Sequence, residues 1–129
     1  MKQVLIGLAM VILLAAAGCT ATLKNINDSP ILTGSEKRAT LAEIQKAIER
    51  AGDSTLWQTQ AVSPGHIVAT RKWKVHMAQV DIKYSTDSYR ITYKNSSDSL
   101  EYDGTQIHKS YNTYVEQLDM AINRELALL

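Results

Sequence analysis

Histidine is the residue type that most often serves as a metal ligand or a general base, and this chain has three of them. They are His66, His76 and His108, and no two are spaced as His-x-His or His-x-x-x-His. A zinc site would therefore need neighbouring strands to bring them together with Asp81 or Asp103. Histidines in turns or at the edge of a sheet are commoner, so we predict no metal site and no metal cofactor.

Serine, histidine and aspartate are all present, but no Gly-x-Ser-x-Gly nucleophile motif accompanies them. We therefore predict no catalytic residue, no cofactor and a protein that is not an enzyme. A hydrolase is the remote alternative, and a histidine within hydrogen-bond reach of a serine or a metal ion would distinguish it.

The densest basic run consists of Arg71, Lys72, Trp73 and Lys74. An aromatic ring among cations can contact phosphate, lipid or an acidic partner, so these residues are a candidate interaction surface. A solvated hairpin tip explains the same run, since charge at a sheet edge discourages edge-to-edge pairing. The run by itself leaves both explanations open.

Tyrosines form the second candidate surface: Tyr84, Tyr89 and Tyr93, with Tyr102 nearby. Tyrosine rings are good interface anchors, because they bury much area at little entropic cost. They would suit a sheet face that the helices leave uncovered. The alternative is ordinary core packing and cross-strand pairing.

Cys19 is the only cysteine, and it ends an N-terminal export pattern. A positive start precedes an almost unbroken apolar run over residues 4–17. As a helix, this run would reach about 21 Å, short of the ~30 Å hydrocarbon core of a membrane. The pattern predicts a signal peptide over residues 1–18, cleaved between Gly18 and Cys19.

That segment ends in Leu14-Ala15-Ala16-Ala17-Gly18-Cys19, which resembles the lipobox of bacterial lipoproteins. The resemblance implies a diacylglycerol on the Cys19 sulfur and an acyl chain, such as palmitate, on its amine. These chains would hold the protein on a membrane. Thr20 stands where an Asp is the usual signal for retention in the inner membrane. The resemblance therefore implies the periplasmic face of the outer membrane of a Gram-negative bacterium.

The mature chain, residues 19–129, is long enough for one small domain and a tether. Removal of Lys2 leaves 13 basic and 13 acidic residues, so the charge gives no reason to expect nucleic acid as a partner. Residues 19–38, which begin with the lipidated cysteine, are polar and rich in turn formers, and we predict a flexible tether there. Residues 39–129 are predicted to form a periplasmic α+β domain.

Two amphipathic helices frame the predicted domain. The first begins with a capping box of Thr40 and Glu43 and is predicted to end at Gly52. The second is predicted to be capped by Ser110 or Asn112. Each has one apolar stripe at helical spacing, made of Leu41, Ile44, Ile48 and Ala51 in the first and of Tyr111, Val115, Leu118, Ile122 and Leu126 in the second.

Between the helices, apolar residues recur at every second position, which is typical of strands. The apolar parity is odd over residues 67–73 and even over residues 78–84, so a turn or a β-bulge must lie between Arg71 and Met77. Of the two, we predict a hairpin turn. Helix, three or four antiparallel strands and helix give a two-layer α+β meander, with both helices on one face. The other predicted elements are strands over 57–62, 89–93 and 100–102 and turns over 85–88 and 95–99.

The domain contains the motifs Pro-Gly-His-Ile at 64–67, Val-Asp-Ile-Lys-Tyr-Ser at 80–85, Tyr-Lys at 93–94, Tyr-Asp-Gly at 102–104 and Ile-His-Lys-Ser-Tyr-Asn at 107–112. Together they are similar to a group of small uncharacterised proteobacterial lipoproteins. The resemblance implies a localisation and a fold but no activity.

Implied localisation, small size and the lack of a catalytic grouping favour a non-enzymatic protein-binding module of the cell envelope. The membrane would be contacted through the lipid anchor, and another envelope protein would be the partner. The alternative is a binder of a small or lipid-like ligand, or of peptidoglycan.

Overall fold

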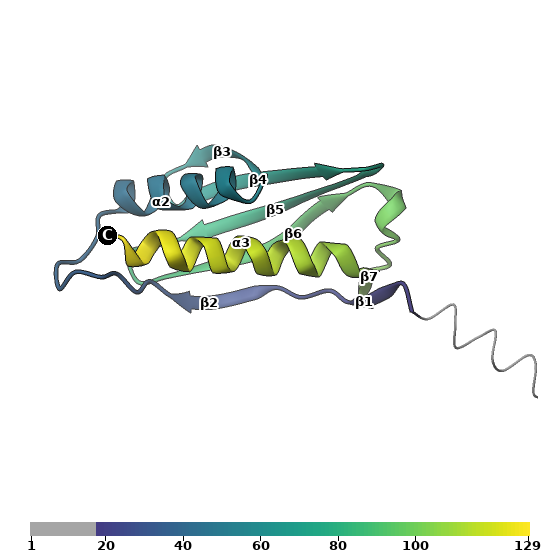
Figure 1. Ribbon diagram of the computed structural model, residues 1–129, viewed down its shortest axis with the longest axis horizontal. Coiled ribbons are helices and arrows are strands. Elements are labelled where there is room, and N and C mark those ends of the chain that lie inside the picture. The colour runs from purple at the N-terminus through teal and green to yellow at the C-terminus, as the bar shows by residue number, and fades with distance from the viewer. Residues whose placement is uncertain (1–17) are drawn as a thin grey trace, which may run out of the picture.

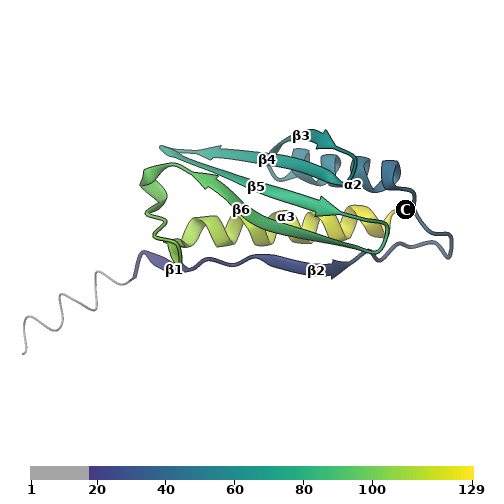
Figure 2. The same cartoon turned by 180° about the vertical axis from the view of Figure 1, so that it is seen from behind.

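Two helices pack on one face of a five-stranded antiparallel sheet in the computed structural model, which describes residues 18–129 (Figures 1 and 2). The α+β prediction is confirmed. The predicted signal peptide, residues 1–18, lies outside the described residues except for Gly18, which is exposed. Across residues 18–129, no helix has the length and apolar character needed to cross a membrane.

The elements follow one another along the described chain in an order close to the predicted one. They are β1 (Thr20–Thr22), β2 (Ile26–Pro30), α2 (Leu41–Ser54), β3 (Gln58–Ser63), β4 (His66–Trp73), β5 (His76–Tyr84), β6 (Ser88–Ser96), the 3₁₀ helix η1 (Asp98–Leu100), β7 (Gln106–His108) and α3 (Lys109–Ala127).

The large sheet has the strand order β2-β6-β5-β4-β3, so β3 to β6 form the predicted antiparallel meander and β2 is a fifth strand at the edge. β1 pairs with β7 in a separate two-stranded sheet. Trp73 lies opposite His76 where β4 turns into β5, and Lys74 in the turn has φ 52°. The predicted hairpin between Arg71 and Met77 is confirmed.

The core lies between the helices and the sheet. The predicted stripes of both helices are buried, apart from half-buried Leu41, and so is every second residue of β4 and β5. Both helices therefore cover the same face of the sheet, as predicted. A fully buried aliphatic side chain contributes about 1.5–3 kcal/mol relative to an exposed one. The fully buried aliphatic residues of the strands and helices include Ile44, Ile48, Ile67, Val80, Ile82, Val115, Leu118 and Ile122.

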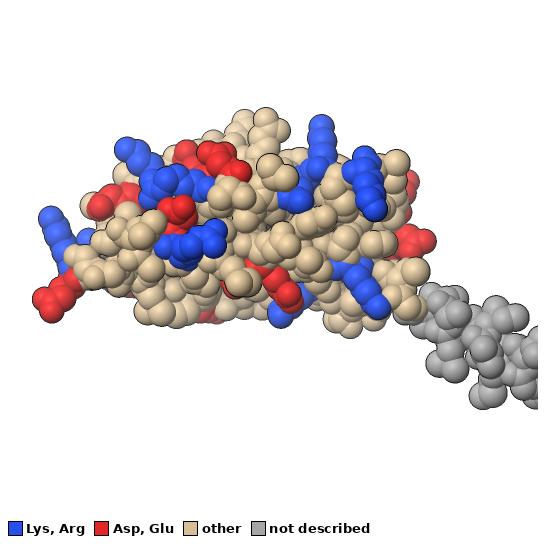
Figure 3. Space-filling view, viewed as in Figure 1, with Lys and Arg blue, Asp and Glu red and all other residues tan. Residues whose placement is uncertain are grey.

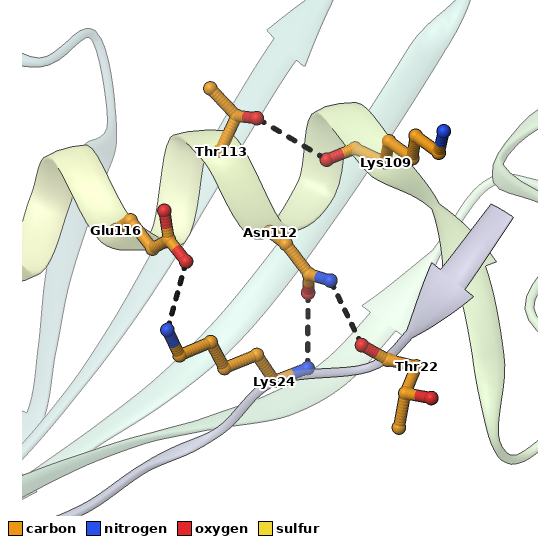
Figure 4. A network of polar contacts seen from close by, with 6 residues as sticks. All are labelled: Thr22, Lys24, Lys109, Asn112, Thr113 and Glu116. Atoms are coloured by element: carbon orange, nitrogen blue, oxygen red, sulfur yellow. Dashed lines mark hydrogen bonds and ion pairs between the residues drawn. The ribbon is translucent and has the colours of Figure 1, made fainter. Parts of the chain in front are cut away.

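The segment predicted to be a flexible tether, residues 19–38, instead contributes β1 and β2. Figure 4 shows how Asn112 of α3 holds this segment. Its side-chain oxygen accepts from the Lys24 backbone N–H at 3.0 Å, and its amide group donates to the Thr22 carbonyl at 2.9 Å. The Lys24 ammonium also lies 2.9 Å from Glu116. The prediction of a tether is therefore wrong where the two strands lie.

The end of α2 lies two residues beyond Gly52, the predicted stop. The helix closes in a Schellman motif, in which the Trp57 N–H donates to the Gly52 carbonyl at 2.9 Å and the Leu56 N–H donates to the Asp53 carbonyl at 3.4 Å. Gly52 does not end the helix but allows close packing of α2 against β3. A Cβ at this position would lie 2.6 Å from the Thr59 methyl group.

Two local predictions before α3 are wrong. The helix is capped by His108, whose Nδ1 accepts from the Ser110 N–H at 3.1 Å, rather than by Ser110 or Asn112. The imidazole nitrogen here takes the part that a short oxygen-bearing side chain usually takes. Residues 100–102 do not form a strand, because Leu100 is the last residue of η1 and Glu101, which follows it, has a left-handed backbone conformation.

Candidate functional site

The tyrosines do not form the predicted surface. Tyr84 and Tyr89 are 7% and 1% exposed, because they alternate in phase with the apolar residues that face the helices. The Tyr89 hydroxyl donates to Asp119 at 2.5 Å, and burial, followed by this hydrogen bond, raises the pKa of Tyr89. Tyr93 is half-buried and stacks on Tyr102 with ring centroids 4.1 Å apart. The prediction of an interaction surface is wrong for Tyr84 and Tyr89.

The four residues of the basic run lie in different surroundings. Arg71 is only 8% exposed, and its guanidinium carbon lies 3.8 Å from the centre of the Tyr114 ring. Trp73 is half-buried and also contacts Tyr114, edge to face, at 4.9 Å between centroids. Lys72 and Lys74 are exposed, the first on the opposite face of β4 and the second in the turn. The run is therefore not one patch, since alternation separates its members.

Two histidines lie within hydrogen-bond reach of a serine, the arrangement that a hydrolase would require. His76 Nδ1 is 2.8 Å from Ser99 Oγ, and His108 Nδ1 is 2.7 Å from Ser110 Oγ. The second pair is the cap of α3. For the first, no carboxylate within residues 18–129 is hydrogen-bonded to His76, and Ser99 Oγ also lies 2.8 Å from Ser97 Oγ. These contacts fasten η1 to the β4–β5 hairpin and do not assemble a nucleophile with an oriented base.

The histidines do not converge on a metal site. His76 and His108 stack with ring centroids 5.3 Å apart, whereas His66 lies on the outer face of the sheet. There His66 Nε2 is 2.7 Å from Asp81, and the Lys94 ammonium is 3.9 Å from the same carboxylate. In the part of the chain that the structure describes, no three His, Cys, Asp or Glu side chains are grouped as a metal would require.

The outward side chains of β3 to β6, called the open face here, form a basic surface that the sequence reasoning missed. Lys72, Lys83, Arg90 and Lys94 are exposed on it, and Lys83 lies directly opposite Arg90 on the neighbouring strand. Asp81 is the only acidic residue of these four strands. The helices leave this face uncovered (Figure 2), whereas the helical face mixes both signs of charge (Figure 3). The sequence did contain a signal for this surface, because its basic residues occupy the polar positions that alternate with the apolar ones along the strands.

Cys19 is exposed and forms no disulfide within the described residues. It directly precedes β1, and its carbonyl accepts from the Lys109 N–H at 3.2 Å. The tip of the β4–β5 hairpin lies at the same end of the molecule (Figure 1). A group attached to the Cys19 sulfur would therefore lie next to the folded domain, with no linker between Cys19 and β1.

No protein-family model, curated protein sequence or solved structure matches this chain. The candidate function therefore depends on the chain's own residues. The open face and the exposed cysteine are the two features with the clearest chemistry.

Proposed function

We propose that this protein is a non-enzymatic, lipid-anchored module on the periplasmic face of the outer membrane, and that its open face binds an acidic surface of another envelope protein. The observation that carries the proposal is the charge of this face, where β3 to β6 carry four exposed cations and the single carboxylate of Asp81. Asp28 of the edge strand β2 adds a second carboxylate, which lines the same hollow as Lys83 and Arg90. His66 and Lys94 already lie beside the Asp81 carboxylate. Within residues 18–129, Lys72, Lys83 and Arg90 form no ion pair, so the face keeps an excess of positive charge. Such a surface attracts acidic partners and repels basic ones.

The position of Cys19 supports the anchoring part of the proposal. The clamp of Asn112 on the backbone at Thr22 and Lys24 fixes the segment that follows the cysteine. Acyl chains on Cys19 would then hold the domain close to the lipid surface, with the strands extending away from that end. The open face would stay accessible at the side of the anchored domain.

The partner-binding part is tested by crosslinking in intact envelopes. We compare the wild-type protein with the double variant Lys83→Glu/Arg90→Glu, which reverses two facing charges on the open face. The variant should lose the crosslinked partner, because like charges across an interface oppose docking. Rebinding of that partner to the purified domain should also weaken as salt is raised, since added ions screen exposed charges.

The matched control is Lys37→Glu/Lys46→Glu, which makes the same charge change at exposed lysines off the open face. This control should keep the partner. Loss of the partner from both variants, or from neither, would show that the open face is not the docking surface.

The anchor is tested separately by mass spectrometry of the mature protein. The expected product begins at Cys19 and carries a diacylglycerol on sulfur and an acyl group on the amine. A mature chain with another first residue, or with a free Cys19 thiol, contradicts the anchor and leaves the binding test unaffected.

A further inference from the structure

A pocket of about 310 Å³ is lined by residues at the end of α2 and in the middle of α3. These helices lie on the side of the sheet opposite the open face (Figure 1). Two arginines line it, and none of its lining residues is acidic. Its walls otherwise combine apolar side chains with hydroxyl and amide groups. The lining residues are Ser54, Thr55, Leu56, Arg71, Gln117, Met120 and Arg124.

Arg71 is the unusual member, because it is a charged side chain more than nine-tenths buried. One terminal nitrogen of its guanidinium donates to the Thr55 carbonyl, and the group lies over the Tyr114 ring. Its Nε–H is buried without an acceptor, and no ion pair joins Arg71 to a carboxylate within residues 18–129. A buried cation is costly unless an anion compensates it, and the guanidinium fork matches a carboxylate.

Leu56 and Met120 add an apolar lining that faces solvent. They are 74% and 68% exposed. Leu56 also occupies the left-handed position of the Schellman motif, with φ 64°, where glycine is the usual residue. The chain thus presents a leucine at a position where its backbone conformation is unfavourable and its side chain is not buried by the fold.

We propose that this pocket binds a carboxylate that bears a short apolar chain. The carboxylate pairs with the Arg71 guanidinium, with Arg124 adding positive charge at the pocket wall, and the apolar chain lies between Leu56 and Met120. Two sources have this chemistry, namely a free fatty acid and the C-terminal carboxylate of a polypeptide that ends in an apolar residue. This inference does not depend on the proposed function, because it uses the other side of the molecule.

The test is a titration of the full mature domain, followed by calorimetry and by the NMR resonance of the Arg71 Nε–H group. The probes are hexanoate, hexanol, a tetrapeptide ending in leucine with a free carboxylate, and the same peptide with an amide end. Hexanoate should bind and move the Arg71 resonance, whereas hexanol should not. If the free-acid peptide binds more tightly than hexanoate and its amide does not bind, the source is a polypeptide terminus; the reverse order indicates a fatty acid.

Arg71→Met should weaken hexanoate binding about tenfold or more, as expected for the loss of a charge-assisted hydrogen bond. Met120→Glu provides a second test at an exposed site that leaves Arg71 in place, and it should weaken binding by repelling the carboxylate. Arg38→Met removes an exposed arginine that does not line this pocket and should leave hexanoate binding unchanged. The proposal is overturned if hexanoate and hexanol bind equally well. It is also overturned if the Met120→Glu variant binds hexanoate as tightly as the wild type. Neither result depends on whether Arg71→Met folds.

Discussion

The two faces of the five-stranded sheet are made by alternate residues of the same strands, yet their chemistry is opposite. On β5, Val80 and Ile82 are fully buried beneath the helices, whereas Asp81 and Lys83 lie on the open face. One period-two pattern therefore supplies both the core and the candidate binding surface. Substitutions on the covered face should change stability, and substitutions on the open face should change binding.

Arg71 departs from this division. Among the described residues it is the only charged one that is buried, and it lies on β4 in phase with Ile67 and Ala69. On the covered face, Arg71 lines the pocket beside α2 and α3. The comparison of the faces therefore identifies Arg71 as a residue that packing alone does not explain.

The largest expected effect is that of Ile82→Ala on the covered face. The free energy of unfolding should fall by about 2–5 kcal/mol, because a fully buried aliphatic side chain is replaced by a cavity. Lys83→Ala, one residue along on the open face, should change it by no more than about 0.5 kcal/mol. Urea denaturation measures both variants, and similar losses for the two would remove the distinction between the faces.

Tyr89→Phe tests how much a polar contact on the covered face contributes to stability. The free energy of unfolding should fall by about 1.5–3 kcal/mol, because the carboxylate of Asp119 loses a hydrogen bond to the Tyr89 hydroxyl. Tyr102→Phe is the control, since Tyr102 is exposed and its hydroxyl makes only a 3.4 Å contact with the Gly104 carbonyl. Equal effects of the two substitutions would contradict this account of Tyr89.

The same tyrosine predicts a dependence on alkaline pH. Burial, followed by the hydrogen bond to Asp119, raises the pKa of Tyr89, so the folded state holds this proton more tightly than the unfolded state. Stability from this group is present below the unfolded pKa of about 10 and is lost as pH rises toward the folded pKa. Tyr89→Phe should therefore reduce the loss of stability above pH ~10. The part due to Tyr84 and Tyr111 should remain, because burial also raises the pKa of both. An unchanged alkaline profile would exclude Tyr89 as a cause.

Asn112→Ala tests the N-terminal clamp beside the sheet. The loss of two hydrogen bonds, both exposed to water, should lower the free energy of unfolding by about 0.5–1.5 kcal/mol. Amide hydrogen exchange should become faster in residues 20–30, while β4 and β5 keep their protection. Thr113→Ala, the next residue along α3, should leave both unchanged; faster exchange throughout the sheet would contradict a local clamp.

Leu56→Gly should have the smallest effect on stability, and that effect should be favourable. A glycine relieves the left-handed strain at this position, so the free energy of unfolding should rise by up to about 1 kcal/mol. The same variant should bind hexanoate more weakly, because it removes one apolar wall of the pocket. Thermal unfolding measures the stability of the variant, and calorimetry measures its affinity for hexanoate. Unchanged hexanoate binding would show that Leu56 is not part of the ligand site.

The sequence by itself determined the elements whose signals are local. The capping box of Thr40 and Glu43 is present, and both of its hydrogen bonds form at the start of α2. The change of parity between β4 and β5 required a turn or a bulge, and the favoured hairpin is present. The spacing of apolar residues in α3 predicted its buried stripe. The same alternation already grouped Tyr84 with Val80 and Ile82, so its burial was within reach of the sequence. The lipid on Cys19 stays a prediction.

The tertiary structure alone decided how distant segments meet. Asn112 holds the backbone at Lys24, 88 residues away, and β2 joins the edge of the sheet although residues 26–30 are mostly polar. The sites of Arg71 and of the basic open face depend on which side of the sheet the helices cover. Periodicity fixes which residues share a face, but the partner that covers that face comes from contacts far along the chain, which a local pattern does not encode.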